Sequence, residues 1–275
     1  MRTFLPIAAA LAMAVPAHAG HHEKAAGSQA ETAMQSTLAD TRRDKDRARD
    51  GFRHPAQTLE FFKVTPGMTV VDYMPGSGWY TRVLVPYLGA QGRYIGLNPA
   101  ITPATPKRLV GYIGGLREKF PAKAKEWKLT GAPVEAYNTD QLTDAMNGTV
   151  DRALIFRGMH NLHRFGMMHA ELSRLHALLS DDGMLGIVQH RAKPWADGVY
   201  TNGHKGYMRQ KDVIGLVEAH GFALVATSEV NANPKDAADY KDGVWELPPV
   251  MRTKREALRP TGESDRMTLL FRKRT

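Results

Sequence analysis

Cysteine is absent from the 275-residue chain. Without thiols the protein has no disulfide bridge, no thiolate-bound metal and no cysteine nucleophile, so its core alone has to supply stability. Acidic residues are also in the minority, because 28 Asp and Glu stand against 37 Lys and Arg. The basic residues form no concentrated tract, and in the densest run, residues 41–50, the two signs alternate. We therefore expect a solvated surface there and no nucleic-acid partner.

Long hydrophobic runs are lacking except at the start of the chain. Residues 1–19 combine a basic Arg2, an apolar stretch over 4–15 and the small-residue pattern Ala17-His18-Ala19. This pattern is typical of a Sec-type signal peptide, and the stretch is short for a membrane span. We therefore predict a signal peptide over 1–19, export to the periplasm, and no integral membrane segment after its removal. The small, polar residues 20–35 predict a flexible leader.

Residues 36–275 are predicted to form one α/β domain, in which strand-like and helix-like segments alternate. The expected strands are 68–73, 93–97, 134–137, 151–156, 184–189 (after a turn at 181–183), 224–230 and 267–272, and the clearest expected helices are 36–50, 55–62, 79–88, 167–179 and 211–220. The alternation predicts a Rossmann-like, doubly wound, mostly parallel seven-stranded sheet. No helix is evident between the last two strands, so we expect the last strand to be antiparallel, at a sheet edge.

A glycine-rich turn follows the first expected strand. It reads Asp72-Tyr73-Met74-Pro75-Gly76-Ser77-Gly78, and glycines in such a turn allow the main chain to come close to a ligand. A dinucleotide fingerprint would need a third glycine, which is lacking after Gly78. The Gly-x-Ser-x-Gly frame of a hydrolase is lacking as well. The remaining alternatives are a site for another ligand and an ordinary tight turn.

The turn resembles the first motif of the class I S-adenosylmethionine-dependent methyltransferases, acid-x-Gly-x-Gly-x-Gly, with Met74 in place of the first glycine. Further segments make residues 40–275 similar to a group of exported bacterial methyltransferase-like proteins. These segments are Arg53-His54-Pro55, Gly78-Trp79-Tyr80-Thr81, Trp245-Glu246-Leu247-Pro248-Pro249 and Gly262-Glu263-Ser264-Asp265-Arg266-Met267. The resemblance implies S-adenosylmethionine as cofactor, a small-molecule methyl acceptor and no metal.

The resemblance also implies a set of cofactor-binding residues at the ends of three strands. They are Asp72, Gly76, Ser77 and Gly78 after the first strand, Asn98 after the second, and Asn138 and Asp140 after the third. The family usually has acids where Asn98 and Asn138 stand. Amides lack the charge-assisted hydrogen bond that a carboxylate makes to a hydroxyl. We therefore expect either weak cofactor binding or a pocket adapted to another ligand.

Two histidines follow the fourth expected strand, in the segment that borders the acceptor in small-molecule methyltransferases. Either His160 or His163 could act as a general base, since imidazole titrates near neutral pH. Their spacing would also suit two metal ligands, but without a third ligand nearby we expect no metal. The structural alternative for each is a helix-start histidine bonded to a neighbouring loop.

Aromatic residues follow the fifth expected strand. Trp195, Tyr200, His204 and Tyr207 suit a lid over a flat acceptor, but a loop packed on its own aromatics would have the same sequence pattern. Two functions therefore remain. The first is a methyltransferase acting on a small molecule. The second is a non-catalytic ligand-binding protein on the same scaffold in the periplasm, since S-adenosylmethionine is made in the cytoplasm and one fold hosts many functions.

Overall fold

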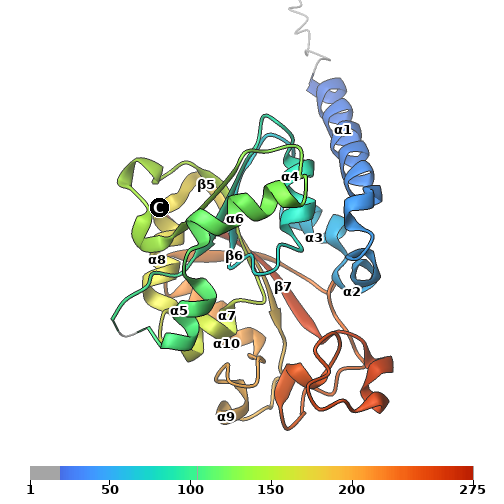
Figure 1. The fold of residues 1–275 in the computed structure, drawn as a ribbon, viewed down its shortest axis with the longest axis vertical. Helices are drawn as coiled ribbons and strands as arrows, with labels where there is room; N and C mark the ends of the chain where they lie inside the picture. The colour runs from blue at the N-terminus through green and yellow to red at the C-terminus, as the bar shows by residue number, and fades with distance from the viewer. Residues whose placement is uncertain (1–18, 104, 275) are drawn as a thin grey trace, which may run out of the picture.

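The computed structural model describes residues 19–103 and 105–274. Seven strands form one sheet in the order β3-β2-β1-β4-β5-β7-β6, with helices on both faces (Figure 1). The strands are β1 (Thr69–Tyr73), β2 (Arg93–Asn98), β3 (Val134–Asn138), β4 (Val150–Phe156), β5 (Leu179–His190), β6 (Phe222–Ser228) and β7 (Arg266–Lys273). The predicted Rossmann-like α/β fold is confirmed. The predicted signal peptide lies outside the described residues, apart from Ala19.

The last strand is antiparallel, as predicted, but it lies inside the sheet. Strands β3, β2, β1, β4 and β5 are mutually parallel, whereas β7 runs antiparallel to both β5 and β6. The direction follows from the connection, because a strand that returns without a crossover helix pairs antiparallel. Consequently β6, and not β7, forms this edge of the sheet.

Ten α-helices are described. They are α1 (Ala19–Ala39), α2 (Asp50–Arg53), α3 (Pro55–Phe61), α4 (Thr81–Leu88), α5 (Lys107–Ile113), α6 (Leu116–Glu126), α7 (Met159–Arg164), α8 (Met168–Leu178), α9 (Gly198–Thr201) and α10 (Gln210–Glu218). Short 3-10 turns occur at η1 (Thr41–Arg43), η2 (Arg47–Arg49), η3 (Thr139–Gln141), η4 (Asp144–Met146), η5 (Gly243–Glu246) and η6 (Glu256–Thr261). The helices predicted over 55–62, 79–88, 167–179 and 211–220 correspond to α3, α4, α8 and α10.

Three local predictions differ from the structure. Residues 20–35 lie in the helix α1 instead of a flexible leader, since Ala, Glu, Gln and Lys favour helix. The helix predicted over 36–50 is broken after Ala39, because the Asp40 side chain accepts a hydrogen bond from the Arg42 N–H and caps a separate turn. The turn predicted at 181–183 is part of β5, whose pairing with β4 shifts register there.

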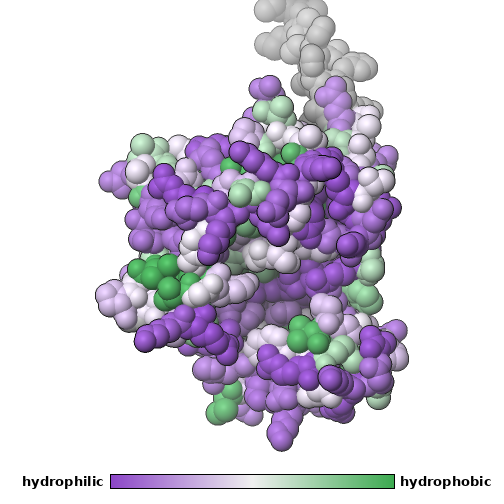
Figure 2. Space-filling view, in the orientation of Figure 1, coloured by the Kyte–Doolittle hydropathy of each residue, from purple (hydrophilic) through white to green (hydrophobic). Residues whose placement is uncertain are grey.

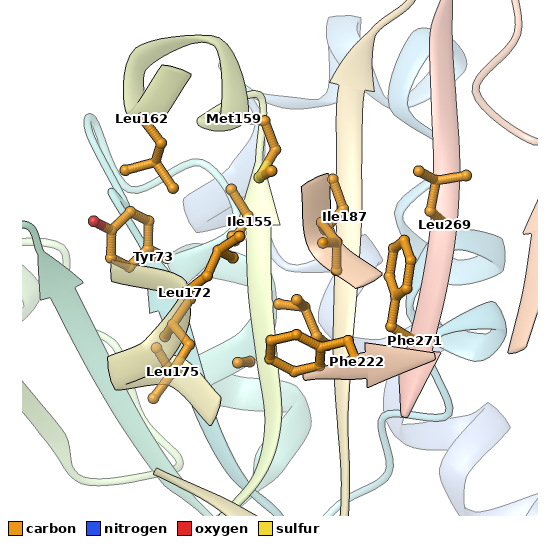
Figure 3. Close-up of a cluster of buried hydrophobic side chains, with 14 of the residues drawn as sticks. Tyr73, Ile155, Met159, Leu162, Leu172, Leu175, Ile187, Phe222, Leu269 and Phe271 are labelled. Atoms are coloured by element: carbon orange, nitrogen blue, oxygen red, sulfur yellow. The ribbon is translucent and has the colours of Figure 1, made fainter. Parts of the chain in front are cut away.

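The hydrophobic core lies on both faces of the sheet. Alternate residues of β4 point to opposite faces, so Ile155 joins one cluster while Leu154 and Phe156 join the other. The first cluster packs α7, α8 and α10 against the sheet and includes Leu172 and Phe222 (Figure 3). The second packs α3, α4 and α6 against the other face. In the part of the chain that the structure describes, no helix has the length and apolar character needed to cross a membrane.

The residues between β6 and β7 form a lobe at the lower edge of the molecule, drawn in orange and red in Figure 1. A small apolar cluster holds it, with Tyr207, Tyr240 and Leu247 among its buried members. The Tyr207 hydroxyl donates to the Asp236 carboxylate at 2.9 Å, which ties the lobe to the segment after β5. Figure 2 shows that the surface is hollowed between this lobe and the rest of the molecule. The lobe therefore borders a cleft.

Candidate functional site

Strand order reverses between β1 and β4, and a cavity of about 350 Å³ opens at that point. Ligands of doubly wound proteins bind in the crevice outside the carboxyl ends of the strands at this place. A second cavity of about 420 Å³ adjoins the first and shares with it Met74, Tyr112, His160, Asn161 and Trp245. The two together form a cleft of the size that small-molecule sites have.

The glycine-rich turn forms one wall of this cleft. Met74, Gly76 and Gly78 all have positive φ, of 56°, 57° and 75°. A positive φ is uncommon for a residue with a side chain, so Met74 keeps the backbone shape that the glycine of the family motif would adopt. Asp72, Gly76 and Ser77, which are proposed from the sequence as cofactor-binding residues, line the cavity.

Gly78 has a different surrounding from the one predicted. It lies outside both cavities, and a Cβ atom at this position would be 2.2 Å from the Trp127 ring. Gly78 therefore makes room for a protein side chain. At Gly76, in contrast, the nearest atom to an added Cβ is the Tyr112 hydroxyl oxygen, at 3.3 Å.

Asp72 is held at the bottom of the cavity. Its side chain is 2% exposed and accepts a hydrogen bond from the Tyr94 hydroxyl at 2.8 Å. Burial raises the pKa of the Asp72 carboxyl to about 7, despite this hydrogen bond. At neutral pH the carboxyl is therefore only partly ionised, which limits its use as a partner for a cationic group.

Asn98 and Asn138, which were predicted to bind the cofactor, instead hold the segment that follows β2. The Asn98 side-chain amide donates to the Ile113 carbonyl at 3.0 Å, and the Asn138 amide donates to the Pro99 carbonyl at 2.8 Å. Both side chains are buried, and neither lines the two cavities. Asp140 is exposed on the turn η3 and also lies outside the cavities. These three residues thus do not join the turn after β1.

A buried glutamate on α8 occupies the space between the ends of β1, β2 and β3. The Glu171 carboxylate accepts from the Tyr73 hydroxyl at 2.8 Å, the Thr139 hydroxyl at 3.0 Å and the Ala100 N–H at 3.1 Å. Burial raises the pKa of Glu171. Its oxygens are engaged with these three groups, and Glu171 lines neither cavity.

The two predicted catalytic histidines both lie on α7 but differ in exposure. His160 is 6% exposed, lines both cavities, and has its Nδ1 atom 3.4 Å from the Gln189 side-chain oxygen. Burial and the nearby Arg164 lower the pKa of His160 to about 3, so its imidazole is neutral at pH 7 but a weak proton acceptor. His163 is exposed and lies outside both cavities. Within residues 19–103 and 105–274, no group of three potential metal ligands is found.

None of the four residues of the predicted aromatic lid lines the two cavities, and only Tyr200 and Tyr207 pack on each other. Tyr200 stacks on Tyr207 at 5.8 Å, and Trp195 is 82% exposed. The cleft is covered by Trp245 of the C-terminal lobe, whose ring meets His160 edge to face at 6.1 Å.

The cavity residues that were not among the predicted site residues include Arg53, Arg157 and His190. Arg157 directly follows β4, and His190 is the last residue of β5. Both lie at the edge of the sheet where ligands bind, so their positions in the sequence could have identified them. Arg53, on α2, reaches the cavity only through tertiary structure.

The comparisons with known proteins concern the fold. In sequence, the chain matches no protein-family model and no curated protein. In structure, it is similar to a proposed methyltransferase in complex with the Trm112 methyltransferase activator of Haloferax volcanii (16% identity, 88% of this chain and 98% of that chain, TM-score 0.50). It is equally similar to the [4+2]-cyclase SpnF (13% identity, 81% of this chain and 80% of that chain, TM-score 0.50). A third similar structure is that of a proposed sarcosine dimethylglycine methyltransferase from Galdieria sulphuraria (12% identity, 84% of this chain and 88% of that chain, TM-score 0.50). The chain therefore has the Rossmann-like fold of methyltransferases.

Proposed function

We propose that the protein is an S-adenosylmethionine-dependent methyltransferase that acts on a small-molecule acceptor. One observation carries the proposal: the turn from Met74 to Gly78 has positive φ at three positions, lies at the switch point of the sheet, and lines a cavity with its residues 74–77. The methyltransferase fold supports it, although the same fold is found in a cyclase.

The residues present fit the amino-acid end of the cofactor. Gly76 and Ser77 expose main chain to the cavity, and Asp72 lies beneath them. The side-chain amides of Asn98 and Asn138 are engaged with carbonyls, so we do not assign them to the ribose. When bound, S-adenosylmethionine supplies an electrophilic methyl group.

The chain's own contribution to transfer is mainly alignment of the acceptor. A weakly basic His160 is suited to accept a hydrogen bond from the acceptor and to orient it, more than to remove a proton from it. Trp245 covers the same place and excludes water from it. We place His163 outside this machinery because it is exposed and lines neither cavity.

The proposal is tested by calorimetric titration of the protein with S-adenosylmethionine and S-adenosylhomocysteine. We expect both to bind, and Gly76→Val to abolish binding, because the new side chain enters the cavity beside Tyr112. Gly166→Val is the matched control: this glycine is also exposed, has a φ of 67°, and has no atom within 4 Å of an added Cβ. Equal affinity of the Gly76→Val and wild-type proteins would contradict the site.

The titration also separates the second candidate, a non-catalytic binding protein on this scaffold. The engaged amides of Asn98 and Asn138 favour it, because they remove the expected ribose contacts. Absence of heat with both compounds, together with an unchanged melting temperature, would reject the methyltransferase and leave this candidate.

We also propose that the protein is exported to the periplasm, on the strength of the signal-peptide pattern in residues 1–19. Expression of the full chain in a Gram-negative host, followed by fractionation and amino-terminal sequencing, tests this. We expect a periplasmic product that begins at Gly20. A full-length cytoplasmic product would contradict the proposal.

A further inference from the structure

The floor of the first cavity is strongly basic. Arg49, Arg53 and Arg157 line it, and Arg266 lies behind them. Glu263 is the acid that they share: its carboxylate lies 2.7 Å from Arg49 Nε, 3.1 Å from Arg53 Nε and 3.2 Å from an Arg266 terminal nitrogen. Four guanidinium groups thus surround one carboxylate, and the cavity carries surplus positive charge.

Arg53 has unused hydrogen-bond donors in this place. The residue is 1% exposed, and only its Nε atom is paired, with Glu263. Both terminal nitrogens are buried and have no partner among the described residues. Buried donors are almost always satisfied, and leaving a charged one unpaired is costly. The Arg53 guanidinium also packs over the Trp79 ring at 4.6 Å, which fixes its plane. These features are those of a group held ready for a ligand.

Arg157 reaches the same cavity from the end of β4. Its φ of 58° is uncommon for a residue with a side chain, and its N–H donates to the Val188 carbonyl at 2.6 Å. Residues held in such a conformation are concentrated at functional sites. Its guanidinium makes no hydrogen bond or ion pair within residues 19–103 and 105–274.

We propose that Arg53 and Arg157 bind an oxyanion, a carboxylate or a phosphate, and that this group belongs to the methyl acceptor. Guanidinium groups present paired donors that match such groups in shape and charge. The assignment to the acceptor rests on the proposed function. S-Adenosylmethionine carries a sulfonium and an ammonium against one carboxylate, so it adds positive charge and leaves the surplus in place. An anionic acceptor would neutralise the surplus positive charge of the cavity.

The state of the charges agrees with this assignment. Burial, with Arg157 as the next contribution, lowers the pKa of Arg53 to about 9, so Arg53 remains charged at pH 7. Asp72, the one acid that lines the cavity, is only partly ionised there. The cavity therefore keeps its positive character at neutral pH.

Titration with inorganic phosphate at pH 7 tests the anion site without an acceptor. We expect the wild-type protein to bind phosphate, and Arg53→Gln and Arg157→Gln each to weaken binding about tenfold or more, because each removes a charged donor. Arg272→Gln is the matched control, since this exposed arginine lies at the opposite end of β7. Arg157→Gln leaves the pairs of Glu263 intact, so it separates lost binding from misfolding. No phosphate binding, or equal effects of all three changes, would overturn the site.

A second titration decides which molecule supplies the anion. We expect phosphate to bind with unchanged affinity when S-adenosylhomocysteine is saturating, because the acceptor and cofactor occupy separate positions. Competition between the two would show that the arginines hold the carboxylate of the cofactor, and would overturn the acceptor assignment. If S-adenosylhomocysteine does not bind, the proposed function fails, while the phosphate series still decides whether the anion site exists.

Discussion

Gly78 illustrates how a motif residue can be required for a reason that its sequence does not reveal. The sequence places it in a ligand-binding turn, and the structure places it against the Trp127 ring. The ring comes from the end of α6, about fifty residues further along the chain, and no local pattern predicts that contact. Gly76 and Ser77, by contrast, lie where the sequence predicts them.

We expect Gly78→Ala to lower the free energy of unfolding about 1–3 kcal/mol more than Gly67→Ala does. Both glycines have positive φ, but an added Cβ at Gly67 meets no atom within 4 Å, so only the Gly78 variant is destabilised by a steric clash. Urea unfolding of the two variants measures the difference. In a Trp127→Leu background, the excess cost at Gly78 should disappear; its persistence would show that the clash is not its cause.

Glu263 gives a pH-dependent prediction. Burial alone would raise its pKa, but Arg53 and the other arginines outweigh burial and lower it to about 2. An acid whose pKa is lowered by folding adds stability above its ordinary pKa near 4.5, and this stability is lost as the pH falls toward 2. We therefore expect Glu263→Gln to cost about 3 kcal/mol or more at pH 7.

The cost of Glu263→Gln should shrink as the pH is lowered from 5 to 3, as followed by urea unfolding. Glu256→Gln serves as control, because Glu256 forms an exposed pair with Arg259 and its loss should leave the melting temperature unchanged. A cost of Glu263→Gln that is equal at pH 7 and pH 3 would contradict the prediction.

At the scale of elements, the sequence predicted the strands better than the site. Apolar runs placed β1 to β4 within two residues, because burial on both faces leaves a continuous hydrophobic signal. The first part of the α1 helix was missed from the sequence because the apolar residues of this helix do not gather on one face along most of its length. Asn98 and Asn138 were placed correctly at strand ends, but the direction of their amides depends on the distant Ile113.

The last turns of the α1 helix should contribute to stability. Met34 is 8% exposed and belongs to the cluster that includes α4, whereas its neighbour Gln35 is exposed. We expect Met34→Ala to lower the free energy of unfolding by about 2 kcal/mol, because it leaves a cavity. Gln35→Ala, its matched control, should leave it unchanged. Thermal unfolding of both proteins provides the measurement, and equal melting temperatures would show that α1 does not dock as described.

For the whole molecule, hydrogen exchange should follow the order of the sheet. Strands β2, β1, β4, β5 and β7 have a bonded neighbour on each side and a core cluster on each face, whereas β3 and β6 form the edges. We therefore expect the slowest amide exchange in the five inner strands and faster exchange in residues 229–262 of the lobe. Mass spectrometry of exchanged peptides measures this. Protection of the lobe equal to that of β4 would contradict the prediction.

The position of β7 between β5 and β6 has a consequence for how the sheet assembles. The strand that joins β5 to β6 is also the last strand of the described residues. Glu263 and Arg266, which organise the arginines, arrive with it. Without residues 263–273 the sheet loses the strand between β5 and β6, and the arginines of the first cavity lose their shared carboxylate, so the sheet and the cavity floor form together.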